Sequence, residues 1–206
     1  MKPELILVGG GGHCRSCIDV IEVESKYKIA GIVDIPDKCG SRVLGYEIIG
    51  CDKDFPELIK KFPNFLITLG QIKSATRRNA LFNQLIEMGV TLCTIVSPMA
   101  YISRHATIGK GTIVMHGAIV NAGARVGNNC IINTKSLIEH DAVIGDDCHI
   151  STGSIVNGGT IIREKTFLGS NSVTSENIEI NKQSLVGCGV RIKQSLPEGS
   201  KKVVDD

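Results

Sequence analysis

The sequence predicts two parts of different fold class, an α/β domain over residues 1–97 and an all-β parallel coil over residues 98–206. In the first hundred residues, apolar segments of strand length alternate with segments of helical pattern, as in a parallel sheet with crossover helices. From residue 102 onward, branched apolar residues recur every six positions, which is the period of neither a helix nor a plain strand. The period changes near Pro98, where we place the domain boundary.

The first element is an apolar strand, "ELILVG", which ends directly in a run of glycines at residues 9–12. A helix is expected to follow from about His13 to Glu24. Its buried stripe would consist of the apolar residues Cys17, Ile18, Val20 and Ile21. A strand, a glycine turn and a helix in this order are typical of the nucleotide-binding α/β folds called Rossmann-like.

The remaining elements of the first part continue the alternation. Two further strands are expected at 28–34 and 64–70, a long helix at 74–89 with a glycine stop at Gly89, and a last strand at 91–98. The order of strands and helices predicts a parallel sheet with crossover connections.

The glycine run is the first candidate binding site. The backbone N–H groups of Gly10, Gly11 and Gly12 can approach a phosphate closely, and the N-terminus of the following helix favours negative charge. Asp34 ends the second strand, where such folds often hold a ribose. The fingerprint is incomplete, so a bare tight turn remains the alternative. His13 either contacts the ligand or packs at the start of the helix.

Composition argues against several classes of function. A net charge of +2, 4% aromatic residues and the absence of a basic run do not suit nucleic-acid binding. No apolar segment has the length of a signal peptide or a membrane span, so we expect a cytoplasmic protein without membrane attachment. Cys14 and Cys17 form a C-x-x-C motif, but no second such pair exists, which favours packing over a metal or redox role.

Residues 102–191 divide into fifteen hexads. Fourteen begin with Ile, Val or Leu, with Thr174 as the exception, and the fifth position is small or Thr in all but Ile178 and Val190. This pattern fits a solenoid with three flat faces, in which three hexads form one coil and residues 18 apart stack. Five coils would be about 24 Å tall. Cys130 and Cys148 are 18 apart and are expected in the interior.

Two histidines stand out on this frame. His140 is the third residue of its hexad, near a corner, where it should face outward beside Asp141. A carboxylate next to an imidazole orients the ring and supports its protonated form, as a general base requires. His149 lies half a coil further along and could donate a hydrogen bond to a developing oxyanion. The alternative is that both are solvated surface residues.

The hexads, together with the segments "VGGGGH", "GIVD", "INTKSLIEHDAVIGDDCHIS" and "LGSNSVT", resemble the hexapeptide-repeat sugar acetyltransferases. More narrowly, the chain is similar to the bacterial sialic acid O-acetyltransferases and UDP-4-amino-sugar N-acetyltransferases, such as the bacillosamine-pathway enzyme. The resemblance covers nearly the full length and implies a left-handed parallel β-helix for the second part. It also implies acetyl transfer from acetyl-CoA without a metal, and a homotrimer with active sites between subunits.

The resemblance also implies roles for individual residues. His140 matches the general base and Asp141 the acidic residue that pairs with it, while Asn133 matches an asparagine near the acceptor. His149 matches the histidine that contacts the acetyl thioester, and Gly158 lies where the pantetheine arm would run. The glycine loop, His13 and Asp34 match the nucleotide-sugar pocket. The family's second aspartate after this strand is replaced here by Ile35.

The expected function is acetyl-CoA-dependent N-acetylation of a UDP-linked amino sugar, in surface-glycan synthesis. O-acetylation of a sialic-acid-like sugar is the alternative in the same class. A non-catalytic β-helix that serves as a binding or scaffold protein is the alternative of another class, and the pair His140–Asp141 counts against it. A nicotinamide-dependent oxidoreductase would follow from the N-terminal half alone, but the glycine fingerprint is incomplete.

Overall fold

The computed structural model describes residues 1–202. Its first part is a six-stranded sheet in the order β3-β4-β2-β1-β5-β6, in which all neighbours are parallel except the β3–β4 hairpin. The strands are β1 (Glu4–Val8), β2 (Lys28–Val33), β3 (Arg42–Val43), β4 (Tyr46–Gly50), β5 (Asn64–Ile67) and β6 (Thr91–Leu92). The helices are α1 (Gly12–Glu24), α2 (Phe55–Leu58) and α3 (Thr76–Glu87), with short 3-10 turns at Pro36–Lys38 and Asp52–Asp54.

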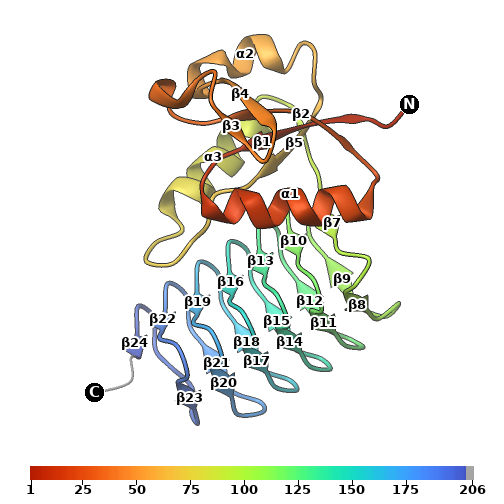
Figure 1. Ribbon diagram of the computed structural model, residues 1–206. Coiled ribbons are helices and arrows are strands. Elements are labelled where there is room, and N and C mark those ends of the chain that lie inside the picture. The colour runs from red at the N-terminus through yellow and green to blue at the C-terminus, as the bar shows by residue number, and fades with distance from the viewer. Residues whose placement is uncertain (203–206) are drawn as a thin grey trace.

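The second part is a three-sided coil of two-residue strands (Figure 1). One face is a seven-stranded sheet of β7 (Ile95–Val96), β10 (Ile113–Val114), β13 (Ile131–Ile132), β16 (His149–Ile150), β19 (Phe167–Leu168), β22 (Leu185–Val186) and β24 (Lys201–Lys202). We call the second face the outer six-stranded sheet; it consists of β8 (Tyr101–Ile102), β11 (Ile119–Val120), β14 (Leu137–Ile138), β17 (Ile155–Val156), β20 (Val173–Thr174) and β23 (Arg191–Ile192). The five-stranded third face has β9 (Thr107–Ile108), β12 (Arg125–Val126), β15 (Val143–Ile144), β18 (Ile161–Ile162) and β21 (Glu179–Ile180).

The hexad repeat produces this coil in a simple way. Strands 18 residues apart pair in parallel, for example Ile131 opposite His149. The first residue of each hexad points inward and the sixth points outward. The fourth residue has a positive φ in every hexad from Gly111 to Gly189, including Asp141 with φ 59. This left-handed corner residue turns the chain from one face to the next.

The interior prediction for the two cysteines is confirmed. Cys130 and Cys148 are fully buried, and each thiol donates to a backbone carbonyl 15 residues further along the chain, at Gly145 and Arg163 respectively. Burial raises the pKa of both thiols, so they are packing groups rather than nucleophiles.

Two expectations from the sequence differ from the structure. The strand expected at 91–98 is split, because β6 joins the α/β sheet while β7 opens the seven-stranded sheet of the coil. The coil is also longer than residues 102–191, since β7 and β24 extend it at both ends. The hairpin β3–β4 and helix α2 were not expected. The boundary at residues 97/98 stays a prediction, and residues 203–206 of the predicted second domain lie outside the described part.

The two parts share a hydrophobic core. Helix α1 lies between the α/β sheet and the seven-stranded sheet (Figure 1). The outward residues of the first strands of that sheet, such as Ile113 and Ile131, pack against the buried face of α1, which includes the predicted stripe and Cys14. Both cysteines of the C-x-x-C motif are buried in this core, and burial raises the pKa of Cys14 to about 11. The seven-stranded sheet is therefore the face of the coil that carries the α/β domain.

Within residues 1–202, no helix combines the length and the apolar character that crossing a bilayer requires. The same residues contain no group of three or more histidine, cysteine, aspartate or glutamate side chains that could hold a metal ion.

Candidate functional site

His140 lies at an exposed corner of the coil, between β14 and β15. Its Nδ1 is 3.0 Å from Asp141 Oδ2, and the side chains are 65% and 73% exposed. Because an ionised carboxylate only accepts hydrogen bonds, Nδ1 carries the proton. In the neutral ring Nε2 is then the free base, and within the described residues it has no hydrogen-bond partner. The corner therefore presents a basic nitrogen to the outside of the coil.

The charges around this corner favour the protonated ring. The hydrogen bond to Asp141 raises the pKa of His140 above its ordinary value; burial opposes this, and the charges of Asp141, Glu139 and Glu176 each add a smaller upward contribution. Glu139 is itself held by the amide of Asn121, at 2.9 Å. A raised pKa makes the imidazole a stronger base once it is deprotonated.

Gly158 lies directly beside the ring of His140. A Cβ built on Gly158 would come within 2.7 Å of both Cε1 and Nε2 of His140. The backbone of Gly158 does not have a positive φ, so glycine is needed here for space rather than for conformation. The absence of a side chain at residue 158 lets the imidazole lie close to the backbone of the next coil. The structure thus joins His140, Asp141 and Gly158 in one place, which we call the corner site.

His149 occupies a different environment. It lies on β16 of the seven-stranded sheet, 6% exposed, with its ring 5.2 Å from Phe167 and 6.5 Å from His13 between ring centres. Burial, and to a lesser degree Arg78, lower its pKa to about 4, although the hydrogen bond to the Gln71 carbonyl opposes this. Burial, followed by the charge of Arg78 and by His149, lowers the pKa of His13 to about 3. Both rings are neutral at pH 7.

Two residues that the sequence did not single out hold this region together. The side chain of Arg78 is 2% exposed and donates to the carbonyls of Ile67, Leu69 and Asn129. Gln71 donates from its side-chain amide to the Asp147 carbonyl, at 2.7 Å. A signal for Arg78 was present, because it stands three residues before Leu81 on the buried stripe of the 74–89 helix. A cation on an apolar stripe indicates a buried polar role.

Asn133 connects to this group through His149. Its Nδ2 is 3.1 Å from His149 Nε2, and its Oδ1 accepts from the backbone N–H of Thr134. We call the group of His13, Gln71, Arg78, Asn133 and His149 the seam cluster, since it lies where the α/β domain meets the coil.

The glycine loop adjoins the seam cluster through His13. Asp34 Oδ2 accepts from the backbone N–H of Gly10 at 2.8 Å and from Lys38 at 2.9 Å, while Oδ1 accepts from Ile35 N–H. Burial opposes ionisation, but these three hydrogen bonds together lower the pKa of Asp34, which keeps it charged.

Gly11 and Gly12 differ from Gly10 in having open space around them. A Cβ at Gly11 or Gly12 would meet nothing within 4 Å, whereas a Cβ at Gly10 would lie 2.9 Å from the Asp34 carboxylate. Helix α1 begins here with no side-chain cap and no acidic residue in its first turn. The first turn of α1 therefore offers an unobstructed, electropositive backbone surface.

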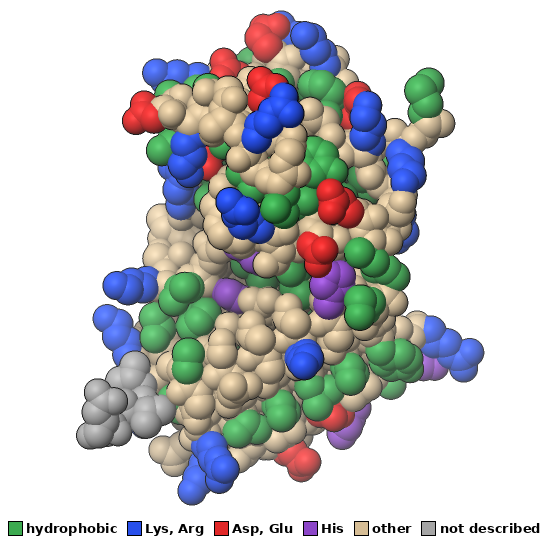
Figure 2. Space-filling view, viewed as in Figure 1, with side chains coloured by type: hydrophobic (Ala, Val, Ile, Leu, Met, Phe, Trp, Pro, Cys, Tyr) green, Lys and Arg blue, Asp and Glu red, His purple; other side chains and the backbone are tan. Residues whose placement is uncertain are grey.

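The predicted site residues thus fall into two groups. His13, Asn133 and His149 lie in the seam cluster, with Gly10, Gly11, Gly12 and Asp34 in the adjoining glycine loop, while His140, Asp141 and Gly158 lie at the corner site. The corner joins the outer six-stranded sheet to the five-stranded sheet, so it is the edge of the coil opposite the seven-stranded sheet. Figure 2 shows histidines in both regions, between the two parts and at the far edge of the coil. One chain alone does not bring the two groups together.

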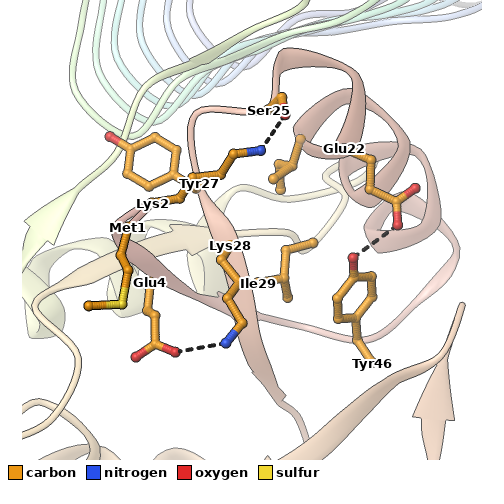
Figure 3. Close-up of a pocket in the computed structure, with 10 residues that line it drawn as sticks. Met1, Lys2, Glu4, Glu22, Ser25, Tyr27, Lys28, Ile29 and Tyr46 are labelled. Carbon is orange, nitrogen blue, oxygen red and sulfur yellow. Dashed lines mark hydrogen bonds and ion pairs between the residues drawn. The ribbon is translucent and has the colours of Figure 1, made fainter.

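A hollow lies elsewhere in the described structure. It has a volume of about 750 Å³ and lies at the C-terminal end of α1, between Tyr27, Tyr46 and Lys28 (Figure 3). Its side chains pair among themselves, as in the contacts of Tyr46 with Glu22 and of Lys28 with Glu4. None of the residues in the two groups lines this hollow.

Comparison with known proteins relates the chain to sugar acetyltransferases. Residues 4–85 match the family model of the PglD N-terminal domain. The chain is 34% identical to UDP-N-acetylbacillosamine N-acetyltransferase from Bacillus subtilis (strain 168) over 116 residues. The aligned region covers 53% of this chain and 50% of the relative. The match thus spans about half the length of this curated relative.

Solved structures extend the likeness to nearly the whole chain. A histidine-to-asparagine mutant of perosamine N-acetyltransferase from Caulobacter crescentus, in complex with CoA and GDP-perosamine, has a TM-score of 0.91 at 28% identity, covering 96% of this chain and 92% of that one. The acetyltransferase domain of PglB from Neisseria gonorrhoeae FA1090, with acetyl coenzyme A, has a TM-score of 0.89 at 25% identity, with coverages of 98% and 96%.

The predicted fold class is confirmed by these likenesses, including the left-handed sense of the β-helix. Both the α/β domain and the hexad coil are covered by the solved structures of sugar acetyltransferases. The chain is therefore similar in fold to sugar N-acetyltransferases over nearly its whole length, and its residues 4–85 match the PglD N-terminal domain.

Proposed function

We propose that this protein is a cytoplasmic N-acetyltransferase that transfers the acetyl group of acetyl-CoA to the amino group of a nucleotide-linked sugar. One observation carries the proposal: at an exposed corner, His140 presents an Nε2 that has no partner among residues 1–202, with Nδ1 held by Asp141 and the ring next to Gly158. A scaffold or binding protein has no need of a base in this arrangement. The relatives that hold CoA and a nucleotide sugar support the same chemistry.

The reaction requires a base and an acyl donor. A sugar amine is protonated at neutral pH, so the ammonium group first releases one proton to solvent, and His140 Nε2 then takes a second proton from the amine as it attacks. The nitrogen then bonds to the thioester carbonyl carbon, and the bond from that carbon to sulfur breaks. The proton held on His140 neutralises the departing thiolate, so the products are the amide and CoA. The chain needs no covalent intermediate, and the buried Cys148 is not placed to form one.

The seam is where we place the nucleotide sugar. Phosphates fit the open first turn of α1, beside Gly11 and Gly12, and Asp34 at the end of β2 is placed to accept from a ribose hydroxyl. Both UDP-linked and GDP-linked sugars occur among the relatives. The relatives therefore do not fix the nucleobase of the substrate, and we expect UDP rather than GDP.

An assembly of several copies reconciles the two separated groups. The outward residues of the outer six-stranded sheet are apolar from one coil to the next, at Tyr101, Ile119, Leu137, Ile155 and Val173. Tyr101 is 60% exposed and Ile119 38% exposed, and Figure 2 shows apolar side chains in a row across β11, β14 and β17. Such a continuous apolar column on a soluble protein favours burial against another subunit.

This apolar face lies between the two groups of site residues. Asn133 follows β13, at the edge where the seven-stranded sheet meets the outer six-stranded sheet, and His140 follows β14, at the other edge. In a homotrimer of parallel coils, packing along this face puts the corner site of one copy beside the seam of its neighbour. The acceptor and the thioester would meet between the two copies.

The test is CoA release from acetyl-CoA, measured with a thiol reagent, over a panel of UDP-linked and GDP-linked amino sugars. The matched control is the same nucleotide sugar with a hydroxyl in place of the amine. We expect turnover with at least one amine and little with its hydroxyl counterpart. Equal turnover of the hydroxyl sugar would favour O-acetylation, and no turnover with any member of the panel would contradict the proposed activity. Light scattering measures whether the protein is a trimer.

A further inference from the structure

His149 donates rather than accepts at one of its two ring nitrogens. Its Nδ1 lies 2.5 Å from the backbone carbonyl oxygen of Gln71. A carbonyl oxygen only accepts hydrogen bonds, so Nδ1 must carry a proton. The ring is neutral at pH 7, because burial lowers its pKa to about 4. Neutral imidazole has a single N–H, and therefore Nε2 carries only a lone pair.

The partner of Nε2 agrees with this assignment. Asn133 Nδ2 lies 3.1 Å from His149 Nε2, and Asn133 Oδ1 accepts from the N–H of Thr134 at 2.8 Å. A flipped Asn133 amide would set two donors against each other at Thr134 and two acceptors against each other at His149. Both ends of the amide thus require Nδ2 to face the imidazole, which makes Asn133 the donor and His149 the acceptor.

The carbonyl that fixes His149 is itself held firmly. Arg78 Nη1 donates to the carbonyls of Ile67 and Leu69, just before Gln71, while Arg78 Nε donates to the Asn129 carbonyl on the coil. The Gln71 side chain donates to the Asp147 carbonyl, which is also on the coil. The segment that follows β5 is therefore attached to the coil through Arg78 and through the side chain of Gln71, the residue whose carbonyl contacts His149.

We propose that His149 is a positioning residue that acts through Asn133. It accepts one amide N–H of Asn133, and the second N–H, which has no partner within residues 1–202, becomes the hydrogen-bond donor to an oxygen of the bound substrate, a carbonyl or a sugar hydroxyl. Asn133 is half-buried, so this N–H can be reached by a ligand. The inference rests on the proposed function for its substrate but not for its hydrogen-bond directions.

This role differs from direct contact of His149 with the thioester carbonyl. A carbonyl oxygen needs a donor, and neutral His149 has no N–H left to give, since Gln71 takes the only one. The two roles therefore predict different tautomers. A donor to the thioester would carry its proton on Nε2, whereas a positioning residue in this relay carries it on Nδ1.

The first experiment is long-range ¹H–¹⁵N NMR on the full chain with ¹⁵N-labelled histidine, at pH 7 and without ligand. The His149 signals are assigned by their loss in His149→Gln. We expect a protonated Nδ1 and an unprotonated Nε2. A proton on Nε2, or on both nitrogens, would overturn the relay. This readout does not depend on activity, so it stands even if the acetyltransferase proposal fails.

The second experiment is a double-mutant cycle on CoA release, with His149→Leu, Asn133→Ala and both together. If His149 acts through Asn133, each single change lowers kcat/KM by about tenfold or more, and the double variant is no worse than Asn133→Ala alone within about threefold. Independent, multiplying losses would overturn the proposal while leaving the acetyltransferase function intact.

The chain offers a matched control for this cycle. His116 also lies at the seam, but its ring contacts Ser97 and Asp19 and not Asn133. The changes His116→Leu and Asn133→Ala should therefore be additive. Non-additivity of that pair as well would show that any seam histidine couples to Asn133 through the fold, and would remove the support for a specific relay.

Discussion

His140 and His149 stand nine residues apart on the same repeat, yet the fold gives them opposite properties. At the corner, an exposed ring next to Asp141 has a raised pKa and a free nitrogen. At the seam, a buried ring against Gln71 and Phe167 has a lowered pKa and both nitrogens engaged. The hexad position alone does not set the pKa or the hydrogen-bond partners of a histidine. Both depend on the face of the coil that carries the histidine and on what covers that face.

The comparison also separates two kinds of substitution. The side chains at the corner are exposed, so replacing one of them removes few packing contacts. Such a change should lower turnover with little effect on the free energy of unfolding. A change at the seam alters contacts shared by the α/β domain and the coil, and should affect stability together with activity.

The largest effect is expected at the corner. Replacement of His140 by alanine removes the base, and we expect kcat to fall by about 10²-fold or more. The thermal midpoint should change little, because the ring is 65% exposed. If His140→Ala retains the full rate with a good acceptor in steady-state assays, His140 is not the base and the contrast between the two histidines does not hold.

The buried histidines of the seam should make the free energy of unfolding fall as the pH is lowered. His13 and His149 have native pKa values of about 3 and about 4, below the ordinary value of 6.5 in the unfolded chain. As the pH falls from 7 through 6.5 towards 4, the unfolded chain binds protons that the native state does not, so stability falls. Each histidine adds a slope approaching about 1.4 kcal/mol per pH unit.

Denaturant unfolding at several pH values between 4 and 7 measures this slope. In His149→Gln the dependence on pH should be weaker than in the parent chain. Equal slopes for His149→Gln and the parent chain would mean that His149 titrates normally in the native state.

A smaller effect is expected from a single methyl group at the corner. In Gly158→Ala the new Cβ would lie 2.7 Å from the His140 ring, which must move, and we expect about a tenfold loss of kcat. In a His140→Ala background there is no ring to displace, so the same change should cost almost nothing. An equal loss in both backgrounds would show that Gly158 acts through something other than His140.

The smallest change concerns the pH profile of activity. Asp141→Asn removes the carboxylate that raises the pKa of His140, so that pKa should fall. A general base works when deprotonated, and the acid limb of kcat should therefore move to lower pH. Asparagine tolerates the left-handed backbone at this position, where φ is 59, so the corner should keep its shape. A limb that stays in place or moves to higher pH would contradict the assignment.

The coil was predictable because its rules are local and repeated. Each inward position, such as Ile138, meets the same three-sided interior, and each fourth position, such as Asp141, makes the same left-handed turn. The exposure of His140 follows from its place in the hexad. The small fifth position placed Cys130 and Cys148 inside for the same reason.

The seam was less predictable because it depends on contacts distant in sequence. The burial of His149 requires Gln71, which is 78 residues away, and no period connects the two. A partial signal existed in the sixth position of every third hexad, where Ile113, Ile131 and Phe167 are apolar although they point outward. The split of the strand at 91–98 depends equally on which sheet each half joins.

The left-handed corner at every fourth hexad position has a consequence for how such chains can change in length. An insertion of six residues ahead of the corner would keep every turn intact but carry His140 to a different edge of the coil. An insertion of 18 would return it to the same edge, one coil and about 4.8 Å further from the first strand. The distance between His140 and the α/β domain can thus vary only in steps of a whole coil.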